Sequence, residues 1–183
     1  KMRLGWDDET RNVAHVARRA AAAGVRMVVI HGRTRMQFYQ GQADWAAIRD
    51  VVEAVDVPVV ANGDIIDAHS AAQALRDSGA AGVMVGRGAQ GAPWRLAQIA
   101  HALYGAQAPD VPRGDDLSDF ISEHYEAILS FYGRDVGLRL ARKHLGWYAD
   151  DCGAPLRAEM MTAQTPEAAL ALIRAAFGER IAA

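Results

Sequence analysis

The stretch VPVVANGDI, residues 57–65, begins as a buried strand and ends in residues that strands avoid. Residues 57–61 form an apolar run, whereas Asn62, Gly63 and Asp64 are typical of turns. In parallel α/β sheets, functional groups gather at the carboxyl ends of strands, where side chains reach a ligand without disturbing the core. The stretch therefore predicts a parallel sheet with a binding site along one edge.

Apolar runs and amphipathic stretches alternate over the first hundred residues, as in a parallel α/β sheet. We expect strands at 1–5, 25–31, 57–61 and 81–87. We expect helices at about 9–23, capped by Asp7 and Asp8, after Asp44, from Asp67 to Gly79, and at about 93–104. Each module spans roughly 24–32 residues, the length of a βα unit. Four such modules predict an α/β fold that is half of a TIM-type (βα)8 barrel, in a domain covering 1–104.

No strand pattern follows residue 104. Residues 105–116 are rich in Gly, Pro and Asp, which predicts a linker. Helices are expected at 117–132, 135–149, 155–163 and 166–178, the last with Thr165 as its cap and Pro166 in its first turn. The sequence thus predicts a small all-helical domain over 117–183.

The composition is that of an ordinary globular protein, with 183 residues, 51% of them hydrophobic, and a net charge of −2. No apolar run approaches the roughly 20 residues that a membrane span needs, and no secretory signal is present, so we expect a cytoplasmic protein that does not contact a membrane. The single cysteine, Cys152, excludes an internal disulfide framework and a cysteine-based zinc cluster, and no metal is expected. The chain opens with KMRLGW and no initiator Met, so we expect a fragment that lacks its N-terminal part.

The other strand ends carry polar groups as well. Gly86 and Arg87 lie where the fourth strand leaves the sheet and predict a phosphate site, because exposed amides and a guanidinium bind phosphate. His31 ends the second strand, and Lys1 lies within the first. Each has a plainer interpretation, as a strand terminator, a surface Arg or a structural His. The predicted fold brings all of them to one rim.

Residues 134–144, RDVGLRLARKH, carry a net charge of +3 although 105–183 as a whole carry −4. Arg139, Arg142 and Lys143 are spaced by three and four residues and share one helix face. Such a face is either solvated surface or a contact for nucleic-acid phosphates.

Five motifs in order carry a family resemblance: KMRLGWD, HGRTRMQFYQGQADW, PVVANGDI, GVMVGRGAQGAPW and LARKHLGWY. Through these five motifs the chain resembles the tRNA-dihydrouridine synthases, in the bacterial branch once named as nitrogen-regulation proteins. The resemblance implies a barrel that binds FMN, a helical domain that binds tRNA, and the reduction of uridine to dihydrouridine with NADPH as electron donor.

The resemblance also implies residue roles. The expected FMN-binding residues are Lys1, His31, Asn62, Gly63, Asp64, Gly86 and Arg87, and the expected tRNA contacts are Arg33, Arg35, Arg139, Arg142, Lys143 and His144. The family's proton-donating cysteine lies in an Asn-x-Gly-Cys-Pro motif that these 183 residues do not contain. We therefore expect no catalytic residue here, no activity from this chain alone, and an incidental role for Cys152 beside Asp150 and Asp151.

Two other functions fit parts of the sequence. The chain could be a non-catalytic RNA-binding module, or belong to a different FMN-dependent TIM-barrel oxidoreductase. Flavin binding separates the first from an enzyme, and the appended basic helix argues against the second. The sequence leaves the oligomeric state open.

Overall fold

The computed structural model describes residues 1–178, which form two compact units. The first contains Lys1–Ala89 and Arg95–Ala108, and the second contains Gln90–Trp94 and the chain from Pro109 onward. Residues 90–94 thus join the second unit, although we predicted them within the 1–104 domain. The reason is packing, because Gly91 lies so close to the backbone of Trp147 that a Cβ atom there would come within 2.2 Å of its carbonyl oxygen. Residues 179–183 of the predicted 117–183 domain lie outside the described part.

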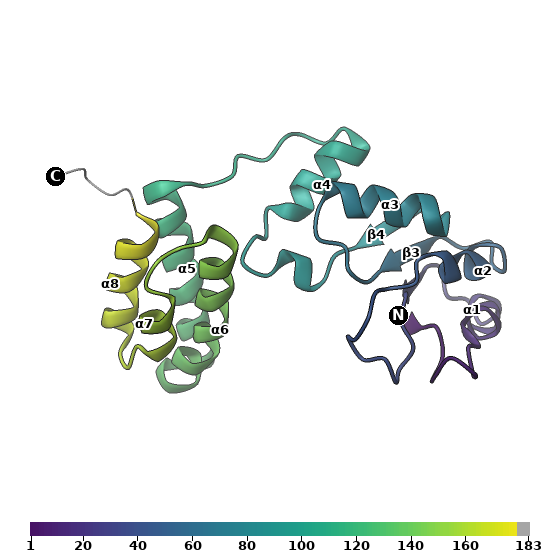
Figure 1. Ribbon diagram of the computed structural model, residues 1–183, viewed down its shortest axis with the longest axis horizontal. Helices are drawn as coiled ribbons and strands as arrows, with labels where there is room; N and C mark the ends of the chain where they lie inside the picture. The colour runs from purple at the N-terminus through teal and green to yellow at the C-terminus, as the bar shows by residue number, and fades with distance from the viewer. Residues whose placement is uncertain (179–183) are drawn as a thin grey trace. The chain divides into compact units, whose positions relative to one another are not determined.

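Four parallel strands form one sheet in the order β1 (Met2–Arg3), β2 (Val28–His31), β3 (Val59–Asn62) and β4 (Gly82–Met84) (Figure 1). The prediction of a parallel sheet of four strands is confirmed. Each strand is shorter than its apolar run. The register aligns Arg3 with His31, His31 with Asn62, and Asn62 with Met84, so the strand ends are level with one another.

One face of the sheet is covered by helices. Strand residues Val28, Ile30, Val59 and Ala61 are buried in one cluster with residues of α1 (Val13–Ala22), of the 3-10 helix η1 (Ala46–Ile48) and of α2 (Arg49–Val52). The unit also contains α3 (Ala68–Ser78), the 3-10 helix η2 (Arg87–Ala89) and α4 (Arg95–Tyr104). Because strand side chains alternate, Val29 and Val60 point to the opposite face together with His31 and Asn62.

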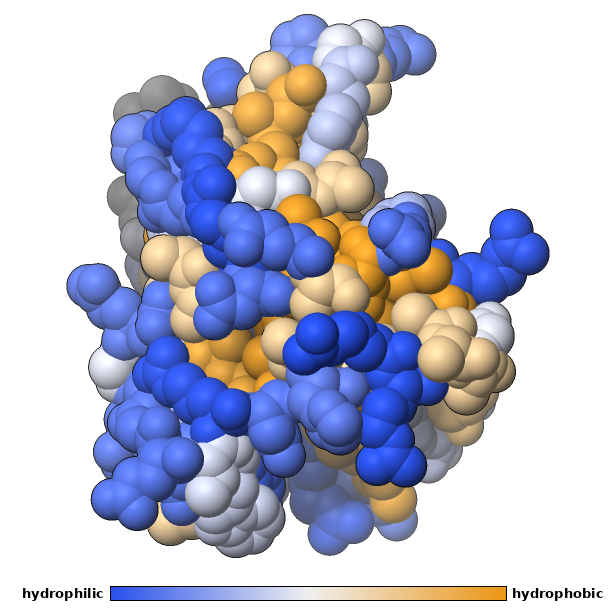
Figure 2. Space-filling view, turned by 90° about the vertical axis from the view of Figure 1, so that its right-hand side faces the viewer, coloured by the Kyte–Doolittle hydropathy of each residue, from blue (hydrophilic) through white to orange (hydrophobic). Residues whose placement is uncertain are grey.

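That opposite face is only partly covered by the described residues. Val29 and Val60 are half-buried, while Met27 and Met84 are exposed. Figure 2 shows one side of the molecule, where apolar surface lies between hydrophilic side chains. Parallel sheets normally have both faces covered, so a sheet with one face only partly covered is unusual.

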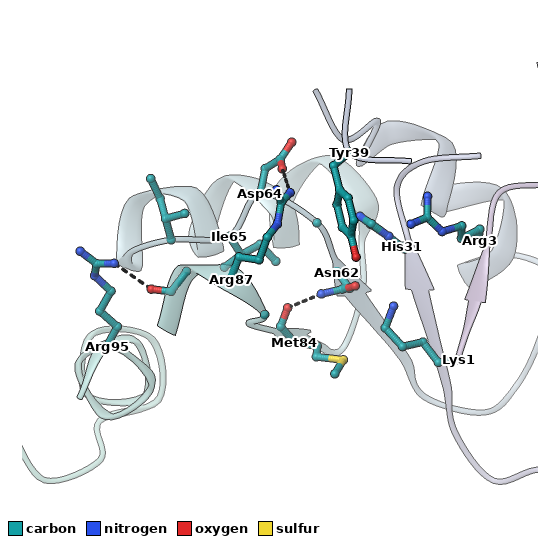
Figure 3. A pocket seen from close by; sticks show the side chains of 14 residues that line it. Lys1, Arg3, His31, Tyr39, Asn62, Asp64, Ile65, Met84, Arg87 and Arg95 are labelled. Carbon is teal, nitrogen blue, oxygen red and sulfur yellow. Dashed lines mark hydrogen bonds and ion pairs between the residues drawn. The ribbon is translucent and has the colours of Figure 1, made fainter. Parts of the chain in front are cut away.

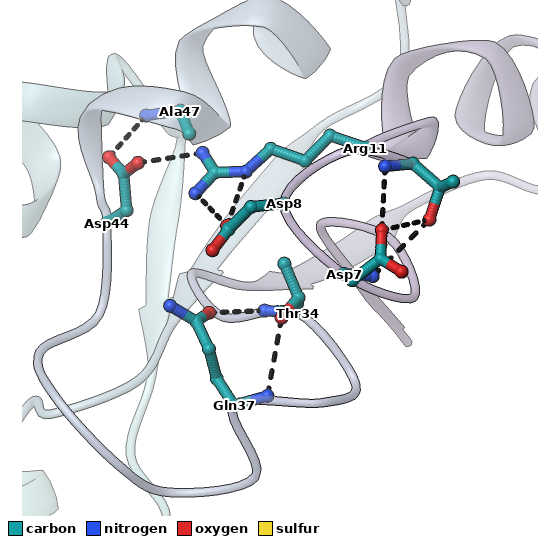
Figure 4. Close-up of polar contacts among 8 residues, drawn as sticks. Asp7, Asp8, Arg11, Thr34, Gln37, Asp44 and Ala47 are labelled. Atoms are coloured by element: carbon teal, nitrogen blue, oxygen red, sulfur yellow. Dashed lines mark hydrogen bonds and ion pairs between the residues drawn. The ribbon is translucent and has the colours of Figure 1, made fainter.

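Two helices begin later than the sequence predicted. The helix expected from residue 9 begins at Val13, because Asp7 bonds the backbone and hydroxyl of Thr10 and Asp8 pairs with Arg11, which holds the chain in a turn (Figure 4). The helix expected from 93 begins at Arg95.

Other helix signals act as predicted or nearly so. The helix expected after Asp44 begins as η1 and continues as α2, and the Asp44 carboxylate accepts from the Ala47 amide at its start. Asp67 caps α3 and Gly79 ends it in a left-handed conformation, as predicted.

The second unit contains α5 (Gly114–Tyr132), α6 (Arg134–Cys152), α7 (Arg157–Thr162) and α8 (Pro166–Phe177). Thr165 caps α8 by accepting from the Ala168 amide, as predicted. The buried side chains of these four helices form one core, which includes Ile121, Tyr125, Leu145, Met160 and Ile173. Among residues 1–178, no helix is both long and apolar enough to cross a membrane.

Candidate functional site

A cleft of 430 Å³ lies at the carboxyl ends of the strands in the first unit (Figure 3). A volume of this size suits a small molecule or a mononucleotide. The structure brings the seven predicted cofactor residues together here and adds others that sequence reasoning missed. The cleft is lined by Lys1, Arg3, His31, Tyr39, Asn62, Gly63, Asp64, Ile65, Ile66, Met84, Gly86, Arg87, Gly88 and Arg95.

The backbone at the end of β3 has positive φ angles at two successive residues, Gly63 and Asp64. Gly63 has φ +114°, and a Cβ atom there would lie 2.7 Å from the His31 ring and 2.8 Å from Ala43. The indole nitrogen of Trp45 donates to the Gly63 carbonyl oxygen at 2.8 Å. Asp64 follows with φ +53°, which is uncommon for a residue with a side chain. The Asn-Gly-Asp sequence therefore encodes a specific turn that also shapes the cleft.

The end of β4 forms an open cradle. No atom lies within 4 Å of the position that a Cβ of Gly86 would take, so its backbone is accessible from the cleft. Gly88, in contrast, packs against the Ile65 carbonyl, which a Cβ would meet at 2.3 Å. The Arg95 guanidinium donates to the Gly88 carbonyl oxygen at 2.8 Å. Two glycines thus have different tasks, one to leave space and one to allow close packing.

Arg33 is a structural residue and not the exposed RNA contact that we predicted. Its side chain is only 2% exposed. Its guanidinium bonds both carboxylate oxygens of Asp64, at 2.6 and 2.9 Å, and the carbonyl oxygens of Gln40 and Gly41. A cation so enclosed cannot reach a phosphate. No local pattern indicates this burial, because the partners lie 7 to 31 residues away. Arg35 is exposed beside Phe38 and stays a predicted RNA contact.

Asp64 joins Arg33 to Arg87. Its carboxylate also accepts from the Ala43 amide at 2.8 Å and lies 3.9 Å from the Arg87 guanidinium. Partial burial acts to raise the pKa of Asp64, but the bonds from Arg33 and Ala43 and the two positive charges outweigh it and lower the pKa. An ionised carboxylate with these partners repels a phosphate. The Asp64 carboxylate therefore serves to hold the Arg87 guanidinium in the cleft, and its expected contact with FMN stays a prediction.

Arg3 and Tyr39 are residues that sequence reasoning missed. The Tyr39 ring lies between two guanidinium groups, with Arg87 at 4.2 Å and Arg3 at 5.7 Å from its centre. Arg3 also donates to the carbonyl oxygens of Thr34 and Phe38, which holds the loop after β2 in place. The spacing of Arg3 from Lys1 could have revealed it, because residues two apart in a strand share a face. Tyr39 lies in a loop and had no such signal.

His31 is neutral at physiological pH. The ring is 6% exposed, and burial followed by the charges of Arg3, Lys1 and Arg33 lowers its pKa to about 4. The pKa of Lys1 is also lowered, first by burial and then by Arg3. Lys1, Arg3, Arg87 and Arg95 supply four cations to the lining, against one carboxylate. The cleft is therefore suited to an anionic ligand.

In the second unit, the predicted basic face is divided. Arg139 and Lys143 are exposed on α6, whereas Arg142 is half-buried and donates to the Ala163 carbonyl oxygen at 2.8 Å. Arg142 therefore has a structural bond in addition to any RNA contact. His144 is half-buried, with its ring centre 5.0 Å from that of Trp147.

Cys152 does not line the cleft. Cys152 is exposed at the end of α6 and is not one of the cleft residues. In the described part of the chain, no group of three or more His, Cys, Asp or Glu side chains could hold a metal ion.

The fold and the cleft together define a parallel α/β unit with a cationic cleft at its strand ends, joined to a helical unit. The family model for dihydrouridine synthase matches residues 1–182, and the chain belongs to this family. It is 72% identical over its full length to a probable tRNA-dihydrouridine synthase of Rhodobacter capsulatus and covers 56% of that protein. It is 52% identical over 87% of its length to a probable tRNA-dihydrouridine synthase of Rickettsia conorii, of which it covers 47%.

A third relative is the tRNA-dihydrouridine synthase B of Xanthomonas axonopodis pv. citri, which is 46% identical over the full chain, with 55% of that protein covered. The chain therefore spans about half the length of the curated relatives it matches.

Proposed function

We propose that the whole protein is a tRNA-dihydrouridine synthase that reduces uridine to 5,6-dihydrouridine in tRNA, with FMN as cofactor and NADPH as electron donor. The observation that carries the proposal is the cationic, glycine-lined cleft, which collects residues from four of the five family motifs at one sheet edge. Because the substrate is a macromolecule processed inside the cell, we also propose a cytoplasmic location.

The residues of the cleft fit FMN. The open backbone at Gly86 and the Arg87 guanidinium offer donors to a phosphate, and the first turn after β4 is closed by the bond from the Ala89 amide to the Gly86 carbonyl. Asn62 is held in place by its donation to the Met84 carbonyl at 2.8 Å. Ile65 and Ile66 add apolar side chains to the lining.

When bound, FMN supplies the hydride for the reduction of the base. Lys1 offers a positive charge to the electron-rich ring, and His31 offers a neutral polar group. Neither His31 nor Asp64 can protonate the uracil carbon at neutral pH, because the first is already neutral and the second is an ionised, paired carboxylate. The resemblance to the family assigns the proton to a cysteine, whose motif does not occur in these 183 residues.

We propose that the four βα modules are the C-terminal half of an eight-stranded barrel. The uncovered sheet face supports this, since Val29, Val60 and Met84 would point into the interior of a closed barrel. The length of the relatives, about twice that of the chain, leaves room for four more modules.

We propose that the helical unit binds tRNA through the exposed Arg139 and Lys143, with Arg142 and His144 beside them and Arg35 contributing from the first unit. A cationic face with helical spacing recognises phosphates without reading bases. Uracil must leave its stack to reach a flavin in a cleft, so the contacts serve to hold RNA during this extrusion.

The dihydrouridine profile of tRNA tests the proposal. Cells that lack the full-length protein should lose dihydrouridine at particular positions, and the wild-type gene should restore it. A normal profile in such cells contradicts the proposal. If the purified protein binds tRNA but no flavin, it is a non-catalytic RNA-binding module and not an enzyme.

A further inference from the structure

The five N–H groups of Arg33 have five acceptors inside the protein. An arginine side chain carries five N–H donors and no acceptor. Nε bonds the Gln40 carbonyl at 3.1 Å, Nη2 bonds the Gly41 carbonyl and Asp64 Oδ2, and Nη1 bonds Asp64 Oδ1. The fifth acceptor is Nε2 of His31, which lies 3.5 Å from Nη1. This contact is long, and it uses the one N–H of Arg33 that the other four bonds leave over.

The contact favours one tautomer of the His31 ring. Because Arg33 can only donate, Nε2 of His31 must present its lone pair, and in a neutral imidazole the proton then resides on Nδ1. We infer that Arg33 is a positioning residue that holds His31 as the Nδ1–H tautomer, so that His31 serves the cleft as a hydrogen-bond donor and not as a base.

The packing of the ring supports this orientation. The Cδ2 and Nε2 edge of the imidazole faces Gly63, where a Cβ would come within 2.7 and 3.1 Å of these two atoms. The Nδ1 edge is on the opposite side of the ring, and His31 lines the cleft. Only a glycine at position 63 allows the ring to lie this close to β3. The tautomer and the ring position thus depend on two neighbours, Arg33 and Gly63.

The charged and polar groups around His31 maintain the neutral form. Lys1 and Arg3 from the β1 segment and Arg33 from the loop after β2 oppose a further positive charge, while Asp64 at the end of β3 favours one. The Tyr39 ring lies 6.4 Å from the imidazole centre. Three cations against one carboxylate, together with burial, keep His31 a neutral donor over the physiological pH range.

The test is NMR of the full-length protein with 15N-labelled histidine. The signals of His31 are assigned by their disappearance in a His31→Asn variant. We expect the Nδ1–H form to dominate in the wild type from pH 8 to 6, and Arg33→Met to shift the tautomer ratio by about tenfold or more toward Nε2–H. Arg33→Lys, which keeps a cationic donor, should restore much of the ratio.

A wild-type His31 that carries its proton on Nε2, or on both nitrogens at pH 7, overturns the inference. An unchanged ratio in folded Arg33→Met also overturns it. If the Arg33 variants do not fold, the wild-type spectrum alone decides.

The role of this donor toward a ligand rests on the proposed function. An Asn side chain places its amide near the position of Nδ1, and a Gln side chain places it near Nε2. His31→Asn should therefore retain FMN better than His31→Gln, and equal affinities contradict a donor role for Nδ1. If the wild type binds no FMN, the proposed function fails while the tautomer result stands.

Discussion

The guanidinium of Arg33 and the carboxylate of Asp64 meet in two parallel hydrogen bonds, of 2.6 and 2.9 Å, between the loop after β2 and the end of β3. Arg33 is buried, whereas Asp64 is 31% exposed. Through its other contacts, the pair holds the loop after β2, the His31 ring and the Arg87 guanidinium in place. A buried cation depends on its partner much more than a surface ion pair does.

Asp64→Ala should destabilise the full-length protein strongly, because it leaves the buried Arg33 cation unpaired. We expect a loss in the free energy of unfolding at or below the ~3–5 kcal/mol of a fully buried pair, since solvent reaches Asp64. Denaturant unfolding measures the loss. Asp56→Ala, at an exposed aspartate, is the control and should change stability by less than ~0.5 kcal/mol. Equal effects of the two substitutions contradict the structural role of the pair.

The same pair makes stability depend on acid. The folded pKa of Asp64 lies below its ordinary value of 3.8, so its contribution is complete above that value and is lost as the pH falls toward the folded pKa. Asp64→Asn should flatten the acid limb of the stability curve. An identical acid limb in the variant would show that the carboxylate is not ionised in the fold.

Gly86→Ala should separate flavin binding from folding. Open space surrounds the position of the new Cβ, so stability should stay within ~0.5 kcal/mol of the wild type. The methyl group extends into the cradle at the end of β4, so FMN affinity should fall. Gly63→Ala is the contrasting variant, because its φ of +114° and the contact with His31 make it destabilising. If Gly86→Ala binds FMN like the wild type, the cradle is not the phosphate site.

The sequence predicted the sheet, and it predicted that polar residues converge at one edge of it. Apolar runs at module spacing indicated four parallel strands, and Asp67 and Gly79 bound α3 as expected. The start of α1 was predicted wrongly because Asp7 and Asp8, which resemble helix caps, bond to Thr10 and Arg11 instead. Local patterns cannot distinguish a cap from a turn that uses the same side chains.

The candidate site was predicted only in part. Residues at the ends of parallel strands converge at one edge of the sheet. The proximity of Lys1, His31 and Asn62 could therefore be predicted without any tertiary information. Arg33 was misassigned because its partner, Asp64, is 31 residues away and the pairing depends on the loop conformation. Tyr39 was missed for the same reason, since its place between Arg3 and Arg87 follows from the fold of an irregular loop.

Arg139→Glu with Lys143→Glu should weaken tRNA binding and reduce the dependence of affinity on salt by about one unit of log–log slope for each phosphate that the variant no longer neutralises. Both side chains are exposed on α6, so folding and FMN binding should not change. Arg174→Glu, an exposed arginine on α8, is the matched control for charge reversal. Wild-type affinity and salt slope in the double variant would show that this face is solvated surface.

Acid should weaken the helical unit through His124 and His144, whose rings lie 4.9 Å apart between α5 and α6. Burial lowers the pKa of both, and His124 further lowers that of His144. Both are therefore neutral in the fold, and the stability they contribute is present above the ordinary pKa of 6.5 and lost as the pH falls below it. The slope of the unfolding free energy against pH should be a fraction of ~1.4 kcal/mol per pH unit, the value for a difference of one bound proton between the unfolded and folded states. It is only a fraction because the rings keep some solvent contact.

His144→Gln should reduce this acid dependence between pH 6.5 and 5, measured by thermal unfolding at constant ionic strength. The same substitution at the exposed His15 of α1 is the control. Equal acid slopes for wild type and His144→Gln contradict the assignment.

The affinity of the full-length protein for FMN, compared between wild type and Arg87→Ala, tests the proposed site most directly. Arg87 lies at the end of β4, stacked on Tyr39 and held near Asp64. Loss of one charge-assisted bond to phosphate, worth ~1.5–3 kcal/mol, should raise the Kd for FMN about tenfold or more. Arg76→Ala, at an exposed arginine of α3, should leave the Kd unchanged. A wild-type Kd in Arg87→Ala would contradict the cleft as the flavin site.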